Sequence, residues 1–166
     1  MTVIATAIGV FCPSQYRVER KVVISASAQK IYESVVRLSE WNRWSAWNID
    51  KDPTLRYSYG GNPGTVGSYM QWSSKKLGEG KLTITEAIRD SRIKYILAIA
   101  GAEGRDVRGR IELTPVPQGV EVVWTAEGDL GHNPLYKLTG LFMDAMMGPD
   151  FEEGLKKLKT LLEPQN

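Results

Sequence analysis

The sequence predicts an α+β fold in which a curved antiparallel sheet of about six to seven strands wraps around a long C-terminal helix. Short segments that alternate apolar and polar residues follow one another from residue 54 to residue 127, joined by hairpin-length turns. This pattern is typical of antiparallel strands. The chain then ends in a segment whose apolar residues have helical spacing. Such a sheet needs a cover on one face, and this segment is the large helix that can provide it.

Before the sheet, the sequence predicts one strand and two short helices. Residues 16–25 are rich in β-branched side chains and are expected to form the first strand. Ser27 can cap a short amphipathic helix over residues 28–38. Residues 39–53 are expected to be a loop or a broken helix, which ends in the turn-like sequence Asp50-Lys51-Asp52-Pro53.

The remaining strands are expected to form a meander in which each strand pairs with the next. Gly, Asn, Asp and Pro gather between the alternating segments, where tight turns need them. In residues 107–113, for example, the alternation places Val107 and Ile111 inward and Arg108 and Arg110 outward. The predicted strands cover residues 54–59, 66–73, 80–88, 92–99, 107–113 and 120–127.

The C-terminal segment is expected to consist of two helical stretches. Asn133 can cap the first stretch. The Gly148-Pro149 pair is expected to break or kink the helix, and Asp150 then caps the second stretch, with Glu153 completing a capping box. Both stretches carry an apolar face, made of Leu135, Leu138, Leu141, Phe142, Ala145, Met146, Phe151, Leu155, Leu158, Leu161 and Leu162.

Composition excludes several classes of function. A chain of 166 residues is the size of one domain. Its net charge of +2 is too small to favour nucleic acid or an anionic membrane surface as a partner. With one cysteine, Cys12, and one histidine, His132, it cannot form an internal disulfide or a cysteine- or histidine-rich metal site, so no metal or cofactor is expected. The aromatic residues are unusual, with 5 Trp and 7 Tyr against 3 Phe.

Residues 1–15 are expected to form an apolar arm that precedes a domain at residues 16–166. Residues 2–12 are uncharged and mostly apolar, but a helix that spans a bilayer needs about 20 residues. They are expected either to pack on the domain or to be the remnant of a membrane anchor that starts outside this sequence. The expected location is therefore cytoplasmic or membrane-associated, with membrane proximity arising from this segment.

A family resemblance rests on residues 16–35, on the tryptophans Trp41, Trp44 and Trp47, and on residues 64–72, 78–87, 119–130 and 140–163. In their order and spacing, these segments resemble the helix-grip fold of the START-like superfamily, also called SRPBCC. Within it, the chain is most similar to bacterial polyketide cyclase/dehydrase-type proteins. The resemblance covers most of the chain and is specific for the fold, whereas such folds host carriers, sensors, cyclases and co-chaperones.

Aromatic and methionine side chains are the candidate lining of a cavity between the sheet and the helix. Aromatic rings combine a large apolar area with a polar tip, and methionine adapts its shape, so both suit an irregular apolar ligand. The alternative is that these side chains fill the core. Tyr69 and Trp72 differ in strand parity, so only one of them can face the helix without a bulge. The candidates are Trp44, Trp47, Tyr57, Tyr59, Tyr69, Trp72, Tyr95, Trp124, Met143, Met146 and Met147.

Three residues are weak candidates for acid–base chemistry. Glu86 lies in the inward phase of its strand, where burial would raise the pKa of its carboxyl group; a bulge or a pairing with arginine is the alternative. Asp144 lies in the Met-rich part of the helix, between the apolar face and solvent, and is either an acid–base group or a surface carboxylate. His132 lies in a loop before the helix, either as a general base at a cavity mouth or as a surface residue.

Three functions compete at this stage. The first is binding or transport of a hydrophobic small molecule, such as a lipid or a polyketide-like compound, in the cavity. The second is an enzyme of cyclase or dehydratase type that uses a cavity acid or base. The third is a protein-interaction or stress-response module with a filled core, in which Trp41, Trp44 and Trp47 contact a partner. An exposed antiparallel edge could also pair two copies into a homodimer.

Overall fold

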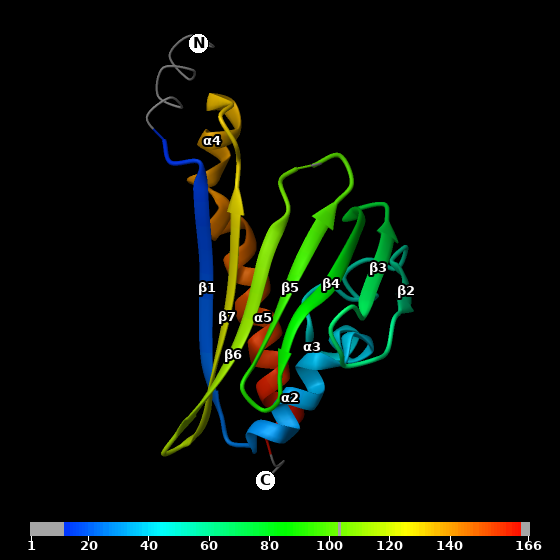
Figure 1. The fold of residues 1–166 in the computed structure, drawn as a ribbon, viewed down its shortest axis with the longest axis vertical. Coiled ribbons are helices and arrows are strands. Elements are labelled where there is room, and N and C mark those ends of the chain that lie inside the picture. Colours follow the sequence, from blue (N-terminus) through cyan, green and yellow to red (C-terminus); the bar gives the residue numbers. More distant parts are fainter. Residues whose placement is uncertain (1–11, 103, 164–166) are drawn as a thin grey trace.

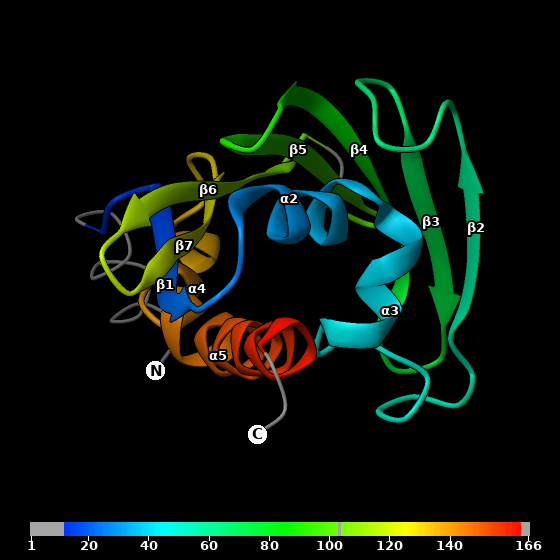
Figure 2. The ribbon, with the colours of Figure 1, turned by 90° about the horizontal axis from the view of Figure 1, so that it is seen from below.

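The computed structural model describes residues 12–102 and 104–163 of the chain. Figures 1 and 2 show an antiparallel sheet that curves around a long helix, as the sequence predicts. The strands are β1 (Gln15–Ile24), β2 (Arg56–Gly60), β3 (Tyr69–Ser74), β4 (Gly78–Ile88), β5 (Arg92–Ile99), β6 (Val107–Val116) and β7 (Gly119–Asp129). The helical elements are α2 (Ala28–Val36), the 3-10 turn η1 (Leu38–Glu40), α3 (Trp41–Trp44), α4 (Pro134–Gly140) and α5 (Met143–Leu162).

The seven strands form one sheet in the order β1-β7-β6-β5-β4-β3-β2, and every neighbouring pair is antiparallel. From β2 to β7, each strand pairs with its successor along the chain, which confirms the predicted meander. β1 joins the sheet beside β7, so the first and last strands are neighbours. Helices α2, α3 and α5 lie on the concave side of the sheet (Figure 2).

Two predicted helix caps are confirmed. The Ser27 hydroxyl accepts a hydrogen bond of 3.2 Å from the Lys30 amide at the start of α2. The Asn133 side chain accepts one of 2.9 Å from the Leu135 amide at the start of α4. Each bond satisfies an amide that the helix itself leaves without an acceptor.

The predicted break at Gly148-Pro149 is wrong, because α5 continues through Pro149 and the chain instead breaks between α4 and α5. Gly148 instead leaves space for the Arg20 side chain. A Cβ atom at this position would lie 2.0 Å from Nη2 of Arg20 on β1. The glycine therefore gives the Arg20 guanidinium room against the helix, where it pairs with Asp144 at 2.7 Å and with Glu152 at 2.5 Å.

The apolar side chains predicted along the first helical stretch do not form part of the core. Leu135, Leu141, Phe142 and Met146 are 50–66% exposed. Helix α4 lies at the end of the molecule where β1 begins (Figure 1), beyond most of the sheet, and therefore finds little to pack against. The second stretch does form a core face, made of Phe151, Leu155, Leu158 and Leu162.

An aromatic cluster fills the space between the sheet and the C-terminal half of α5. The rings of Trp124 and Phe151 stack with their centroids 4.0 Å apart, and Trp41 and Trp44 meet Trp124 edge-on at 5.7 and 5.4 Å. The Trp124 indole donates a hydrogen bond of 2.8 Å to the buried Tyr95 hydroxyl. The indole groups of Trp41 and Trp44 donate to the carbonyls of residues 35 and 34 on α2. The cluster therefore buries large apolar area and leaves no indole N–H of these three tryptophans without an acceptor.

Several aromatic rings lie over glycines on the neighbouring strand. Added Cβ atoms would lie 1.9 Å from the Tyr95 ring at Gly109 and 2.2 Å from the Trp72 ring at Gly80. The cross-strand pairs are Tyr16–Gly128, Tyr69–Gly60, Trp72–Gly80 and Tyr95–Gly109. A glycine that is covered by an aromatic ring permits strong sheet curvature without leaving a void.

The loop before β2 is tied down by the buried carboxylate of Asp52. It accepts hydrogen bonds from the hydroxyl of Ser74, from the hydroxyl of Thr54 at 2.7 Å and from the amides of Thr54 and Lys76 at 2.9 and 3.2 Å. These donors, the two hydroxyls first, hold the pKa of Asp52 well below its usual value. The network joins the loop to the end of β3.

We expect Gly109→Ala to destabilise the fold by about 1–3 kcal/mol, because the new methyl group overlaps the buried Tyr95 ring. Urea unfolding measures the change. Arg108→Ala, at the neighbouring exposed position on the outer face, is the control and should change stability by less than about 0.5 kcal/mol. A Gly109→Ala protein as stable as the wild type would contradict the close ring–glycine packing.

We expect Asp52→Asn to lower stability at neutral pH, and the difference from the wild type to shrink as the pH falls below about 4. The folded-state pKa of Asp52 is depressed, so its stabilising contribution is complete above the unfolded-state value of 3.8 and is lost as the carboxylate is protonated. Denaturant unfolding between pH 7 and pH 2.5 measures it, with the exposed Asp50→Asn as control. A constant difference across this range would show that the ionised carboxylate has no special role.

Candidate functional site

A cavity of about 400 Å³ lies beside the aromatic cluster, between the sheet and the N-terminal half of α5. Strands β2 to β6 supply one wall, and α3 and the loop after it supply another. Helix α5 contributes Met143, Met146, Met147 and Asp150. Helix α5 thus faces packed core along its C-terminal half and a cavity along its N-terminal half. Ile99 and Met146 are the exposed residues of the lining, and we call them, together with the half-buried Arg105 of the loop before β6, the mouth.

Hydrogen bonds hold one wall of the cavity in place. The Tyr57 hydroxyl donates 2.6 Å to the Trp47 carbonyl, and the Trp47 indole donates 3.0 Å to the Asp150 carboxylate. Lys51 also pairs with Asp150. Burial, together with the neighbouring Tyr59, raises the pKa of Tyr57 to about 12, so its phenol stays a protonated donor at neutral pH. Burial likewise raises the pKa of Tyr16, at the opposite side of the lining.

The structure brings part of the predicted ligand-binding set together. The predicted residues that line the cavity are Trp47, Tyr57, Trp72, Met143, Met146 and Met147. Trp44, Tyr95 and Trp124 instead belong to the aromatic cluster, where they fill the core. Tyr59 stacks on Tyr57 but is 46% exposed and lies outside the lining.

Strand register explains why Trp72 lines the cavity and Tyr69 does not. Trp72 pairs with Tyr57 and Gly80, whose row faces α5, whereas Tyr69 pairs with Gly60 and Thr83 on the other face. There the Lys81 ammonium lies 4.1 Å from the centre of the Tyr69 ring. Tyr69 is therefore corrected from a candidate ligand contact to an outer-face residue.

Burial also corrects one predicted role of the three-tryptophan motif. Trp41 is 1% exposed and Trp44 is 0% exposed, so neither can contact a partner protein. The three-residue spacing turns both indoles toward the core from a single helical turn. Trp41 also lines the floor of the cavity, next to Trp47 and Ser45.

Glu86 does not face the cavity, because a β-bulge between Ile84 and Glu86 shifts the register of β4. The shift turns Glu86 to the outer face, opposite Lys94. There it pairs with Arg92 at 2.5 Å and with Lys94 at 3.3 Å, and the hydrogen bond from Arg92 is the main reason that its pKa is lowered rather than raised. The inward placement predicted for Glu86 is thus wrong.

Asp144 and His132 also lie outside the cavity lining. Asp144 is bound by Arg20, whose hydrogen bonds lower the pKa of the carboxyl group. His132 is exposed in the loop between β7 and α4. In the same loop, the Gly131 amide donates a hydrogen bond of 2.8 Å to Asp129, and this bond is the main reason that the pKa of Asp129 is lowered.

Sequence reasoning missed much of the lining. Met70 shares the parity of Trp72, and that signal could have identified it; the loop residues carry no comparable pattern. Arg105 is the most informative of them, because it is a cation in an apolar lining. The missed lining residues are Tyr16, Trp41, Ser45, Leu55, Met70, Leu77, Leu82, Leu97, Ile99, Ala102, Arg105, Val107, Leu130 and Asp150.

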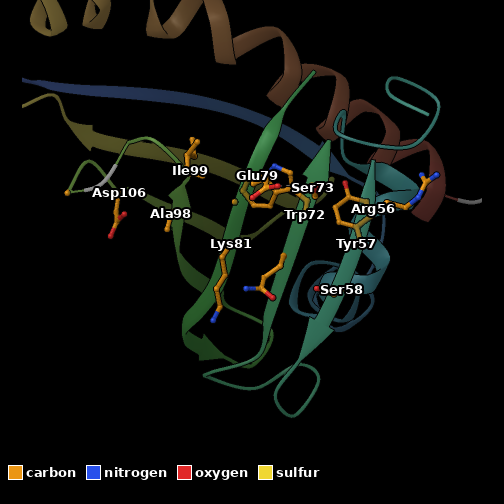
Figure 3. A pocket seen from close by; sticks show the side chains of 14 residues that line it. Arg56, Tyr57, Ser58, Trp72, Ser73, Glu79, Lys81, Ala98, Ile99 and Asp106 are labelled. Atoms are coloured by element: carbon orange, nitrogen blue, oxygen red, sulfur yellow. Dashed lines mark hydrogen bonds between the residues drawn. The ribbon is translucent and has the colours of Figure 1, made fainter. Parts of the chain in front are cut away.

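The outer face of the sheet carries a second depression of about 710 Å³, an open trough across β2 to β5. Figure 3 shows that its side chains come from these strands and from the loop before β6. The outward side chains are mainly short or polar, among them Ser58, Ser73, Lys81 and Ala98. Because it is open to solvent, the trough offers an apolar ligand less burial than the inner cavity, which is the stronger site.

The described helices include none that is long and apolar enough to cross a membrane. The predicted arm or anchor remnant at residues 2–12 lies, except for Cys12, outside the described residues. Within residues 12–102 and 104–163, no group of three or more His, Cys, Asp or Glu side chains is arranged to hold a metal ion.

The sheet, the gripped helix and the cavity between them define a START-like helix-grip protein. The model of one family, described as polyketide cyclase/dehydrase and lipid transport, matches residues 15–163. The chain therefore belongs to this family. A search of curated proteins gives no match.

Solved structures support the same fold. A norcoclaurine synthase point mutant from Thalictrum has a TM-score of 0.68 at 14% identity, covering 89% of this chain and 94% of that one. The di-domain ARO/CYC protein StfQ of the steffimycin biosynthetic pathway has a TM-score of 0.67 at 10% identity, covering 89% of this chain and 50% of StfQ. Protein CV1439 from Chromobacterium violaceum has a TM-score of 0.63 at 18% identity, covering 92% and 99%.

We expect Tyr57→Phe to lower stability by about 1 kcal/mol, because the Trp47 carbonyl loses its 2.6 Å hydrogen bond. Tyr59→Phe is the matched control. Tyr59 stacks on Tyr57, but among the described residues its hydroxyl has no hydrogen-bond partner, so the expected change is close to zero. Denaturant unfolding measures both. Equal effects of the two substitutions would mean that the Tyr57 hydroxyl does not hold this wall.

Proposed function

We propose that the protein binds or transports a hydrophobic small molecule, such as a lipid or a polyketide-like compound, in the cavity between the sheet and α5. The observation that carries this proposal is the lining itself, in which aromatic, methionine and aliphatic side chains surround about 400 Å³. That volume is within the usual range of small-molecule sites, roughly 300–1,000 Å³. Burial of apolar ligand surface contributes about 25 cal/mol per Å², before the costs of association.

The placement of acidic and basic residues favours binding over catalysis. Glu86, Asp144 and His132 all lie away from the cavity. Among the described lining residues, Asp150 is the one carboxylate, and it is already engaged by Trp47 and Lys51. A cyclase or dehydratase would need an acid or base that can reach the substrate, so this alternative ranks second.

Exposed apolar side chains near the mouth support a contact with a membrane or a partner protein. Leu135, Tyr136, Leu141, Phe142 and Met146 are all more than 40% exposed on α4 and the start of α5. Such a patch beside a cavity for apolar molecules suits a surface where ligand enters or leaves. Membrane proximity through the N-terminal segment remains a proposal of the same kind.

Pairing of two copies is a separate proposal. Among the described residues, β1 and β2 are the two edges of the sheet, and each has one side without a neighbouring strand. β2 is short, so an added strand would gain few hydrogen bonds there. β1 is longer and offers the better edge for a homodimer.

The matched pair Leu97→Trp and Ile96→Trp tests the proposed function. Leu97 lines the cavity, and Ile96 is exposed on the outer face of the same strand. We expect the neutral fluorescent probe N-phenyl-1-naphthylamine to bind the wild type and Ile96→Trp alike, and Leu97→Trp at least about tenfold more weakly, because the indole fills the cavity. Fluorescence titration measures binding. Absence of binding to the wild type, or unchanged binding to Leu97→Trp, would overturn the proposal.

A further inference from the structure

Arg105 is the one cation among the described residues of the cavity lining. It lies in the loop between β5 and β6, is half-buried, and forms part of the mouth. Most of the lining around it is apolar, including Ile99, Ala102 and Val107. A charged group in such surroundings calls for an electrostatic partner.

Among the described residues, no carboxylate pairs with Arg105. Arg105 Nη2 donates to the Gly101 carbonyl at a long 3.3 Å, and the guanidinium carbon lies 4.3 Å from the centre of the Tyr136 ring on α4. A guanidinium group has five N–H donors, so most of those of Arg105 have no acceptor among the described residues. Asp150, the carboxylate of the lining, is engaged by Trp47 and Lys51. Asp106, next in the chain, lines the outer trough instead.

We propose that the ligand is an amphiphile with an apolar body and one carboxylate, and that Arg105 binds this carboxylate at the mouth. This inference rests on the proposed function and adds the chemistry of the head group. A guanidinium donates two parallel hydrogen bonds to a carboxylate, which fixes the orientation of the ligand. One cation balances one negative charge, whereas a phosphate monoester carries about −1.5 to −2 at neutral pH. The aromatic and methionine residues deeper in the cavity then hold the body.

The Tyr136 contact fits this role. A cation–π contact gives the guanidinium no hydrogen-bond acceptor. The Tyr136 ring thus holds the Arg105 side chain while leaving its N–H donors for a ligand. It also ties the β5–β6 loop to α4 across the mouth.

Two matched ligand pairs test the proposal by isothermal titration calorimetry at low ionic strength: decanoate with decanamide, and anthracene-9-carboxylate with anthracene-9-carboxamide. The members of each pair share the apolar body and differ in charge. We expect the wild type to bind the acid of at least one pair about tenfold or more tightly than the amide. Equal affinity for acid and amide in both pairs would overturn the carboxylate assignment.

Variants of Arg105 test whether this residue causes the preference for the acid over the amide. We expect Arg105→Gln to reduce the acid-to-amide ratio to below about threefold, and Arg105→Lys to keep part of it, since lysine retains the charge without the planar fork. Arg108→Gln removes one positive charge from an exposed outer-face position nearby and should keep the wild-type ratio. A full ratio in Arg105→Gln would overturn the role of Arg105 even if the wild type prefers acids.

The outcomes separate this inference from the proposed function. If the amides and acids bind equally, the cavity binds apolar molecules and only the head-group assignment fails. If none of the four compounds binds the wild type and N-phenyl-1-naphthylamine also fails to bind, both proposals fail together. Circular dichroism spectra of the Arg105 variants confirm that each is folded before binding is compared.

Discussion

The stack of Trp124 on Phe151 is the contact on which the rest of the structure depends. It joins β7 of the sheet to α5, with the ring planes only 6° apart. Gly154 permits this approach, because a Cβ atom there would lie 3.1 Å from the Trp124 ring. The stack fixes where α5 touches the sheet, and Trp41 and Trp44 then fill the remaining space on that side. On the N-terminal side of Phe151, the helix lines the cavity through Met143, Met146, Met147 and Asp150.

Different forces hold the two halves of α5. The C-terminal half buries aliphatic and aromatic side chains against the sheet. Along the N-terminal half, Arg20 of β1 pairs with Asp144 and Glu152 across the gap that Gly148 leaves. The pairings, with Asp144 first, raise the pKa of Arg20 further above its usual value, so these pairs persist at any physiological pH. Ion pairs at the flank of the helix stabilise its position without filling the cavity that the methionines line.

Sequence predictions succeeded where the structure depends on residues close in sequence, and failed where it depends on distant ones. The caps at Ser27 and Asn133 and the meander from β2 to β7 depend on residues that are close in sequence, and all are confirmed. For Glu86 the inward placement is wrong and the alternative, a bulge and a pairing with arginine, is confirmed; the bulge turns the side chains after it, and no sequence pattern decides between the two placements. The Gly148-Pro149 pair was expected to break or kink the helix; the helix does not break there, and Gly148 makes room for Arg20 of β1, more than a hundred positions earlier, which no local pattern indicates. The sequence does not distinguish aromatic residues that fill the core from those that line the cavity. That distinction depends on the stacking of Trp124 on Phe151, which is a long-range contact.

The central claim is that the space beside the aromatic cluster is a site for an apolar molecule and not unused packing volume. Native mass spectrometry of the full chain as purified from cells tests it most directly. The account predicts a mass above that of the polypeptide by one small molecule, which is lost on extraction with organic solvent and is then identified in the extract. A bare polypeptide mass, together with no rise in melting temperature across a panel of lipids and aromatic polyketides, would contradict it.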